Sequence, residues 1–175
     1  MSVTASPRRL FLGLWPSAAE HHRLVEIAST FAGKHAVKPD NLHLTLVFLG
    51  ATTAERWVCY ERVLSDMNVP ALTLSLDCLG YWPKPRILWL GTSKPPLALT
   101  ALVLDLNRRL EGCGFTPERR PFSPHITLAR KFPGPAPRDP IREPIAWRVD
   151  HVVLAESLRQ EDGTHYRVVR RWPEG

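Results

Sequence analysis

Two copies of one short pattern hold the residues best suited to chemistry. The tetrapeptides His-Leu-Thr-Leu at residues 43–46 and His-Ile-Thr-Leu at residues 125–128 both set a histidine two positions before a threonine. In an extended strand, alternate side chains point to opposite faces. Each copy is therefore expected to present an imidazole and a hydroxyl side by side on one face, with its two apolar residues turned into a core.

Paired imidazoles match a reaction that needs a separate acid and base. A histidine with an unperturbed pKa of about 6.5 can accept a proton when neutral and donate one when charged. His43 and His125 are the candidates for these roles. The hydroxyls of Thr45 and Thr127 would donate hydrogen bonds to a bound oxyanion. Arg130, which closely follows the second copy, would clamp phosphate oxygens with two N–H groups.

Each of these residues also has a purely structural interpretation. Strand threonines are common for their β-propensity alone, and arginines are mostly exposed to solvent. A single strand histidine is more commonly structural than catalytic, so the repetition of the pattern is what favours chemistry for His43 and His125. The histidines without a twin are expected to be structural or at the surface, and they are His21, His22, His35, His151 and His165.

The six tryptophans are expected to pack rather than to form a nucleic-acid platform. Core positions are predicted for Trp15, Trp57, Trp89 and Trp147, and packing at strand ends for Trp82 and Trp172.

Hydrophobic periodicity predicts an α+β fold with largely antiparallel sheets. Strands are predicted at 8–15, 41–50, 71–82, 86–92, 124–130, 147–159 and 164–172, and helices at 17–33, 53–67 and 97–114. Ser17, with Glu20 three residues later, and Thr53 have the sequence signatures of helix N-caps. Hairpins combined with helices disfavour a doubly wound parallel sheet.

The repeated pattern also predicts internal symmetry. A duplicated strand–helix–strand unit related by a pseudo-two-fold axis would bring its two equivalent strands together. His43 and His125 would then face each other across one cleft between two lobes. With 175 residues and 44% hydrophobic content, the chain is expected to form a single domain over residues 1–175.

The charge balance favours a polyanionic partner. The net charge is +6 and the calculated pI is 9.7, which attracts polyanions at long range. Solubility alone is the other explanation for this charge. Basic residues cluster around the second copy of the pattern, at Arg119, Arg120, Arg130 and Lys131, where a phosphate would be bound.

Cysteine usage and hydropathy bear on location. Cys59, Cys78 and Cys113 are odd in number, far apart and without C-x-x-C spacing, which argues against a disulfide framework and a zinc ribbon and favours a reducing cytoplasm. The apolar run near the N-terminus is too short for a secretory signal, and no stretch has the roughly 20 apolar residues of a membrane span. We expect a soluble, cytoplasmic protein, and nothing in the sequence requires more than a monomer.

The sequence resembles a known superfamily. The two patterns, their separation, and the stretches NLHLTLVFLG, RILWLG and RRPFSPHITLAR resemble the two-histidine (2H) phosphoesterases, and within them the LigT/ThpR group of RNA 2′,3′-cyclic phosphodiesterases, also called 2′-5′ RNA ligases. The resemblance implies a bilobal fold around a central cleft. It also implies hydrolysis of the 2′,3′-cyclic phosphate end of an RNA to a 2′-phosphomonoester, with no metal and no nucleotide cofactor.

The resemblance assigns roles to individual residues. His43 would be the general acid that protonates the leaving 3′ oxygen, and His125 the general base that activates water, although the two labels could be exchanged. Thr45, Thr127 and Arg130 would bind phosphate oxygens.

Phe48 matches an aromatic position suited to stacking on a base. Strict alternation along the strand would place Phe48 on the face opposite His43, so this assignment requires a twist or bulge. The proline-rich loop at 131–144 has no counterpart in the resemblance and is expected to shape substrate entry.

Other activities remain open at the level of sequence. The same chemistry with an RNA hydroxyl in place of water would join tRNA halves through a 2′,5′ linkage. A non-catalytic module that binds RNA ends or nucleotides would use the same cleft. A metal site on His43 and His125 is disfavoured because zinc takes three or four ligands. The substrate could be a tRNA fragment, another RNA end or a small cyclic nucleotide.

Overall fold

The computed structural model describes residues 6–138 and 141–173, which contain nine strands and three α-helices. The strands are β1 (Arg8–Leu14), β2 (Leu44–Thr52), β3 (Leu72–Leu76), β4 (Cys78–Trp82), β5 (Ile87–Gly91), β6 (His125–Ala129), β7 (Ile145–Val149), β8 (Val152–Gln160) and β9 (Gly163–Trp172). The helices are α1 (Ala18–Ala32), α2 (Ala54–Leu64) and α3 (Leu97–Glu111), and two short 3₁₀ turns, Gly33–His35 and Pro39–Asn41, precede β2.

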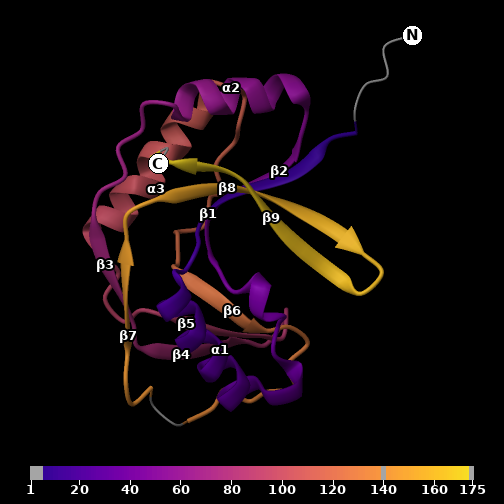
Figure 1. Cartoon of the computed structure of the whole chain (residues 1–175), viewed down its shortest axis with the longest axis vertical. Helices are drawn as coiled ribbons and strands as arrows, with labels where there is room; N and C mark the ends of the chain where they lie inside the picture. Colours follow the sequence, from indigo (N-terminus) through magenta and orange to yellow (C-terminus); the bar gives the residue numbers. More distant parts are fainter. Residues whose placement is uncertain (1–5, 139–140, 174–175) are drawn as a thin grey trace.

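Seven strands form one antiparallel sheet in the order β4-β5-β6-β2-β1-β8-β9, and β3 pairs with β7 in a second sheet (Figure 1). The predicted α+β class with antiparallel sheets is confirmed. The predicted hairpin between 147–159 and 164–172 is the β8–β9 pair.

The two lobes meet where β2 pairs with β6. In this antiparallel pair, Leu44 lies opposite Ile126. These residues hold the same position in the two copies of the repeated pattern. An antiparallel pair of equivalent residues is the contact that a two-fold axis produces. The predicted internal symmetry therefore places β4-β5-β6 on one side of the axis and β2-β1-β8-β9 on the other.

One face of the large sheet is covered by helices and carries the main core. Leu44, Leu46, Ile126 and Leu128 are buried there, together with apolar residues of α1, α2 and α3. Helix α1 follows β1 but contacts β6 and β7, whereas α3 precedes β6 but contacts β2, and Figure 1 shows α3 beside α2. The helices thus bind the two lobes together and leave the opposite face of the sheet free for the polar residues of the pattern.

Local signals fix where the helices begin. The backbone N–H of Ser17 donates to the Glu20 carboxylate over 2.9 Å, as a capping box requires. The Thr53 hydroxyl accepts the backbone N–H of Arg56 over 3.3 Å. Both predicted N-caps are confirmed because capping depends on neighbours within a few residues in the chain.

Two predicted strands are each divided in the structure. The span 71–82 breaks at Asp77, so that β3 pairs with β7 while β4 pairs with β5. The span 147–159 breaks at Asp150 and His151, between β7 and β8. At the first break, the Asp77 carboxylate accepts hydrogen bonds from the backbone and hydroxyl of Ser93, at 2.7 and 2.6 Å. Each break moves the chain from the small sheet to the large one, which hydrophobic alternation does not reveal.

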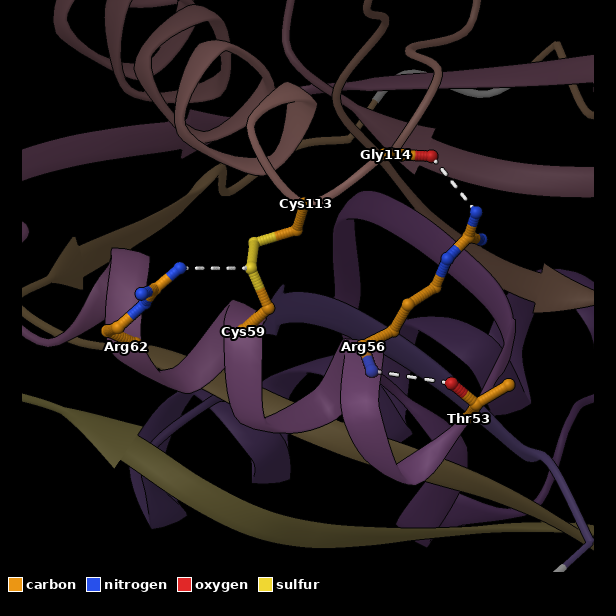
Figure 2. Close-up of a disulfide and its surroundings, with 6 residues drawn as sticks. All are labelled: Thr53, Arg56, Cys59, Arg62, Cys113 and Gly114. Carbon is orange, nitrogen blue, oxygen red and sulfur yellow. Dashed lines mark hydrogen bonds between the residues drawn. A yellow bond between two sulfur atoms is a disulfide. The ribbon is translucent and has the colours of Figure 1, made fainter.

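The prediction that the cysteines form no disulfide is wrong. Cys59 on α2 and Cys113 just after α3 are joined by a disulfide with their Cα atoms 5.8 Å apart, and Cys78 is free (Figure 2). Beside the bridge, the guanidinium of Arg56 donates to the carbonyl of Gly114 over 3.2 Å. The odd count and long spacing were misleading because only the packing of α2 against α3 brings the two thiols together. The cysteine argument for a reducing cytoplasm therefore fails, and the location stays a prediction.

Reduction of this disulfide should destabilise the fold without abolishing it. The bridge closes a loop between positions 54 residues apart, and removing such a crosslink costs about 2–4 kcal/mol through the entropy of the unfolded chain. Urea unfolding of wild type with and without dithiothreitol should give a lower midpoint under reduction. Cys59→Ser should be as unstable as the reduced wild type and insensitive to the reductant, with Cys78→Ser as the control. Equal midpoints for oxidised and reduced wild type would contradict a stabilising crosslink.

Candidate active site

His43 is oriented by the backbone just before it. Its Nδ1 lies 2.7 Å from the carbonyl oxygen of Asn41. A carbonyl can only accept, so Nδ1 carries a proton and the neutral ring presents its lone pair at Nε2. The Nε2 atom is 2.9 Å from the hydroxyl of Thr45, which donates to it. The ring is thus held with a basic nitrogen beside the threonine of its own pattern.

His125 is oriented in the same way. Its Nδ1–H donates to the carbonyl oxygen of Ser123 over 2.8 Å. In both copies, then, the carbonyl two residues before the histidine fixes the tautomer with the proton on Nδ1, which makes Nε2 the basic nitrogen. This shared geometry follows from the repeated sequence, although the role of the carbonyls is not visible in it.

Aromatic rings surround His43. The Trp15 ring stacks on it with centroids 5.1 Å apart, the edge of Tyr166 approaches to 4.7 Å, and Phe11 lies 4.9 Å away. Trp15, predicted to be a core residue, is partly buried and packs against the core cluster that contains Phe11 while its ring also covers His43. Tyr166 and Phe11 were not among the predicted site residues, because nothing in the local pattern of β9 or β1 indicates a ring against a histidine.

His125 has its own aromatic neighbours in the other lobe. The Trp82 ring is edge-on at 4.6 Å, and Trp89 lies 6.5 Å away. Trp89 occupies the space above Gly80, where an added Cβ would come within 1.9 Å of the indole. Gly80 is therefore the small residue that lets Trp89 lie flat across β4 and β5.

Burial makes both imidazoles weak bases in the free protein. Desolvation lowers the pKa of His43 from 6.5 to about 4, opposed by the hydrogen bond to Asn41 and assisted by the charges of Arg130 and His125. Desolvation also lowers the pKa of His125, opposed by the hydrogen bond to Ser123 and assisted by Arg130. The positive charge of Arg130 therefore reaches both rings.

A cavity of about 280 Å³ opens beside His43. Thr127 and Arg130 line it from the second lobe, and Tyr166 lines it from β9. Arg130 is exposed and makes no ion pair with the residues that the structure describes. Three of the predicted site residues thus share one cavity across the lobe boundary, whereas His125 and Thr45 lie outside its lining.

Phe48 lies on the same face as His43. The pairing of β1 with β2 shifts register twice, so that Gly13 opposes Thr45 but Phe11 opposes Phe48. The rings of Phe11 and Phe48 are 6.4 Å apart, and Phe48 is 60% exposed. The irregularity that the assignment of Phe48 required is therefore present, and its role as a base platform stays a prediction.

The cavity is also lined by the segment 35–38, whose contact with β6 was not predicted from the sequence. Ala36 bridges Ala129 of β6, and the backbone N–H of Val37 donates to Leu128 over 2.8 Å. His35, predicted to be structural, also lines the cavity, with its ring edge-on to Phe132 of the loop at 131–144. Residues 139–140 of that loop lie outside the described residues, and its expected influence on substrate entry stays a prediction.

Two general observations concern metals and membranes. Within residues 6–138 and 141–173, no three side chains of histidine, cysteine or acidic residues gather as a metal site would require. No helix in the described part of the chain combines the length and the apolar character needed to cross a membrane.

The fold and the site define a class of protein in which each of two lobes contributes a strand with a histidine and a threonine, and these two strands pair in antiparallel fashion. A family model described as the 2′-5′ RNA ligase superfamily matches residues 14–161. The chain belongs to this superfamily, which confirms the family resemblance seen in the sequence.

Individual relatives match nearly the whole chain. An Escherichia coli (strain K12) protein named RNA 2′,3′-cyclic phosphodiesterase is 32% identical over 171 residues, which cover 96% of this chain and 97% of the relative. A crystal structure described as a phosphoesterase superimposes with a TM-score of 0.87 at 31% identity, covering 95% of this chain and 97% of that one. The structure of E. coli LigT complexed with 3′-AMP has a TM-score of 0.84 at 30% identity, covering 95% of this chain and 97% of that one.

Removal of the Arg130 charge should make both histidines more basic. Because Arg130 lowers the pKa of each ring, Arg130→Gln should raise the pKa of His43 and of His125 relative to wild type. An NMR titration that follows the imidazole nitrogens of the free protein would measure both shifts. Arg108→Gln, an exposed position on α3, removes the same charge away from the cavity and should change neither pKa. An unchanged pair of values in Arg130→Gln would mean that its charge does not reach the rings.

Proposed function

We propose that this protein hydrolyses the 2′,3′-cyclic phosphate end of an RNA to a 2′-phosphomonoester by acid–base catalysis with two histidines. The observation that carries the proposal is the matched orientation of His43 and His125, each held through Nδ1 by the carbonyl two residues earlier. The pairing of Leu44 with Ile126 brings the two histidine strands side by side. Each ring therefore offers Nε2 to a group bound between the lobes.

The remaining residues of the proposal would bind the phosphate. Arg130 would donate two N–H groups to its oxygens, and the Thr127 hydroxyl would donate one hydrogen bond. The Thr45 hydroxyl, which donates to Nε2 of His43 in the free protein, would turn to the phosphate once that nitrogen is protonated. Phe48 would stack against the terminal base. Phosphate bound in this way is polarised toward attack, because the donors stabilise the negative charge that grows on its oxygens.

The reaction then needs one proton removed and one supplied. His125 accepts a proton at Nε2 from water, whose oxygen attacks phosphorus. The bond between phosphorus and the 3′ oxygen breaks, and the leaving oxygen takes the proton from Nε2 of His43. The product has a 2′-phosphate and a 3′-hydroxyl, and the next cycle needs only a proton exchange between the rings and solvent.

The low pKa of His43 in the free protein bears on its assignment as the acid. At a pKa of about 4, little of the free ring is protonated near neutral pH. A bound phosphodiester carries a negative charge that opposes the charge of Arg130, and so it raises the pKa of both rings. Substrate binding would therefore supply the protonated state that the acid requires.

Further parts of the proposal concern cofactors, substrate and location. We propose that no metal or nucleotide takes part, because protons and hydrogen bonds suffice for the steps above. An RNA substrate is supported by the name of the E. coli relative and by the net charge of +6. Small cyclic nucleotides and tRNA fragments carry the same reacting group. We further propose that the protein acts as a monomer in the cytoplasm.

Substitution of either histidine should abolish most of the activity. His43→Ala and His125→Ala should each lower kcat by roughly 10²–10⁴-fold, the usual contribution of a positioned acid or base. The assay is hydrolysis of a short RNA that ends in a 2′,3′-cyclic phosphate, with EDTA present, and with the product identified as the 2′- or 3′-monophosphate. Loss of wild-type activity on chelation would contradict the metal-free mechanism.

A matched control separates this effect from general damage. His22→Ala removes an imidazole that is 77% exposed on α1 and should retain wild-type turnover. Retention of RNA binding without turnover by the wild-type protein would instead favour a binding module. A 2′,5′-linked product in the presence of an RNA hydroxyl end would favour ligation.

The pH dependence should differ between the free and the bound protein. Catalysis needs one neutral and one protonated imidazole. The rate therefore has a bell-shaped pH dependence, with its maximum between the two apparent pKa values of the pair. Both pKa values lie below 6.5 in the free protein, so kcat/KM should be maximal below pH 6.5. The bound phosphate raises both values, so the maximum of kcat should lie at a higher pH. Steady-state rates measured between about pH 4 and 8, a range that includes the ordinary pKa of histidine, would test this. Maxima of kcat and kcat/KM at the same pH would contradict it.

A further inference from the structure

Lys38 is a second cation at the cavity that contains Arg130 and His43. Its backbone is fixed from one side, because the preceding residue, Val37, donates to Leu128 of β6 over 2.8 Å. Its Nζ atom reaches the other lobe, where it lies 2.6 Å from the Asp162 carboxylate and 3.1 Å from Nε2 of His165. The ammonium group is thus held at the turn between β8 and β9.

Strand β9 lines the cavity with Thr164 and Tyr166 and connects this ammonium group to His43. Tyr166 touches the His43 ring, and two residues earlier the carbonyl of Thr164 accepts the side-chain N–H of Asn41 over 2.8 Å. Asp162, which pairs with Lys38, is a further two residues back. Strand β9 therefore connects the turn that holds Lys38 to the ring of His43, through Thr164 and Tyr166 of the cavity lining.

The charged side chains that line the cavity are cationic. No carboxylate is among the described residues that line the cavity. The ion pair between Lys38 and Asp162 is open to solvent, with side chains 40% and 62% exposed. Exposed ion pairs of this kind contribute little to stability, so an incoming anion can replace Asp162 on Lys38 at small cost. The cavity lining therefore combines two cations, Lys38 and Arg130, with the side chains of Val37 and Tyr166.

We propose that Lys38 binds the phosphodiester that joins the terminal nucleotide to the rest of the RNA, so that the site selects chains of two or more nucleotides over cyclic mononucleotides. This inference rests on the proposed function, in which Arg130 binds the reacting cyclic phosphate. An RNA chain offers a second charged phosphate one nucleoside away from the reacting one, and Lys38 is a second cation in the same cavity as Arg130. Lysine supplies a compact point charge on a flexible stem, which suits a phosphodiester held without strict geometry.

The test compares two substrates with the same terminal base. One is a 2′,3′-cyclic mononucleotide, and the other is a dinucleotide that ends in the 2′,3′-cyclic phosphate. The wild-type protein should have the higher kcat/KM for the dinucleotide. Lys38→Met should lower the ratio of kcat/KM for the dinucleotide to kcat/KM for the mononucleotide by about tenfold, the usual effect of losing one hydrogen bond to a charged group. It should also weaken the salt dependence of the dinucleotide KM, by a log–log slope of about 0.7 for one lost phosphate contact.

Matched variants and a modified substrate isolate the contact. Lys94→Ala removes one positive charge at an exposed position before α3 and should preserve the wild-type ratio. Lys38→Arg keeps the cation and should also preserve it. Asp162→Asn removes the competing carboxylate and should raise the ratio. A dinucleotide with an uncharged methylphosphonate linkage should be handled alike by the wild type and by Lys38→Met.

The possible outcomes separate this inference from the proposed function. If wild type hydrolyses both substrates and Lys38→Met has the same ratio, the inference is overturned while the proposed function stands. A Lys38→Met ratio that falls equally for the charged and the methylphosphonate dinucleotide would also overturn it, because the effect would then not depend on the phosphate charge. If folded wild type hydrolyses neither substrate, the proposed function fails and this inference fails with it.

Discussion

The antiparallel contact between β2 and β6 is the constraint on which the site depends. Leu44 pairs with Ile126, and both side chains are buried on the helical side of the sheet. Because alternation then fixes the faces of their neighbours, the histidine and threonine of each copy must point the other way. A slip of one residue by either strand would bury the imidazole of that strand in the core and turn its apolar residues into the cleft. The same apolar packing that joins the lobes therefore positions the polar residues.

The two copies share a backbone arrangement but have different surroundings. Each imidazole donates to the carbonyl two residues before it, yet His43 is more enclosed, with Trp15 and Tyr166 against its ring. Burial among apolar rings lowers the pKa of both histidines, and the effect at His43 is large. His43 lines the cavity of about 280 Å³ and His125 does not. Local symmetry thus creates the pair, and the surroundings of the two rings make them unequal.

Much of the architecture could be predicted because its determinants are local. Capping at Ser17 and Thr53, the hydrophobic period of the helices and the β8–β9 hairpin all depend on residues close in the chain. The breaks at Asp77 and Asp150 escaped prediction because they mark a change of sheet, which depends on distant partners. The disulfide escaped for the same reason, since its cysteines are 54 residues apart.

By itself, the sequence determined the family, the fold class and the candidate residues, because a repeated pattern at strand spacing can be recognised without knowing its partners. Tertiary structure decided everything that requires contact between distant segments. It placed Trp15 against His43 as well as against a core cluster, and it brought Phe48 to the same face through two register shifts that simple alternation does not contain. It also joined Lys38 to the β8–β9 turn beside the cavity. Such juxtapositions depend on how sheets pair and helices pack, and a linear pattern does not specify them.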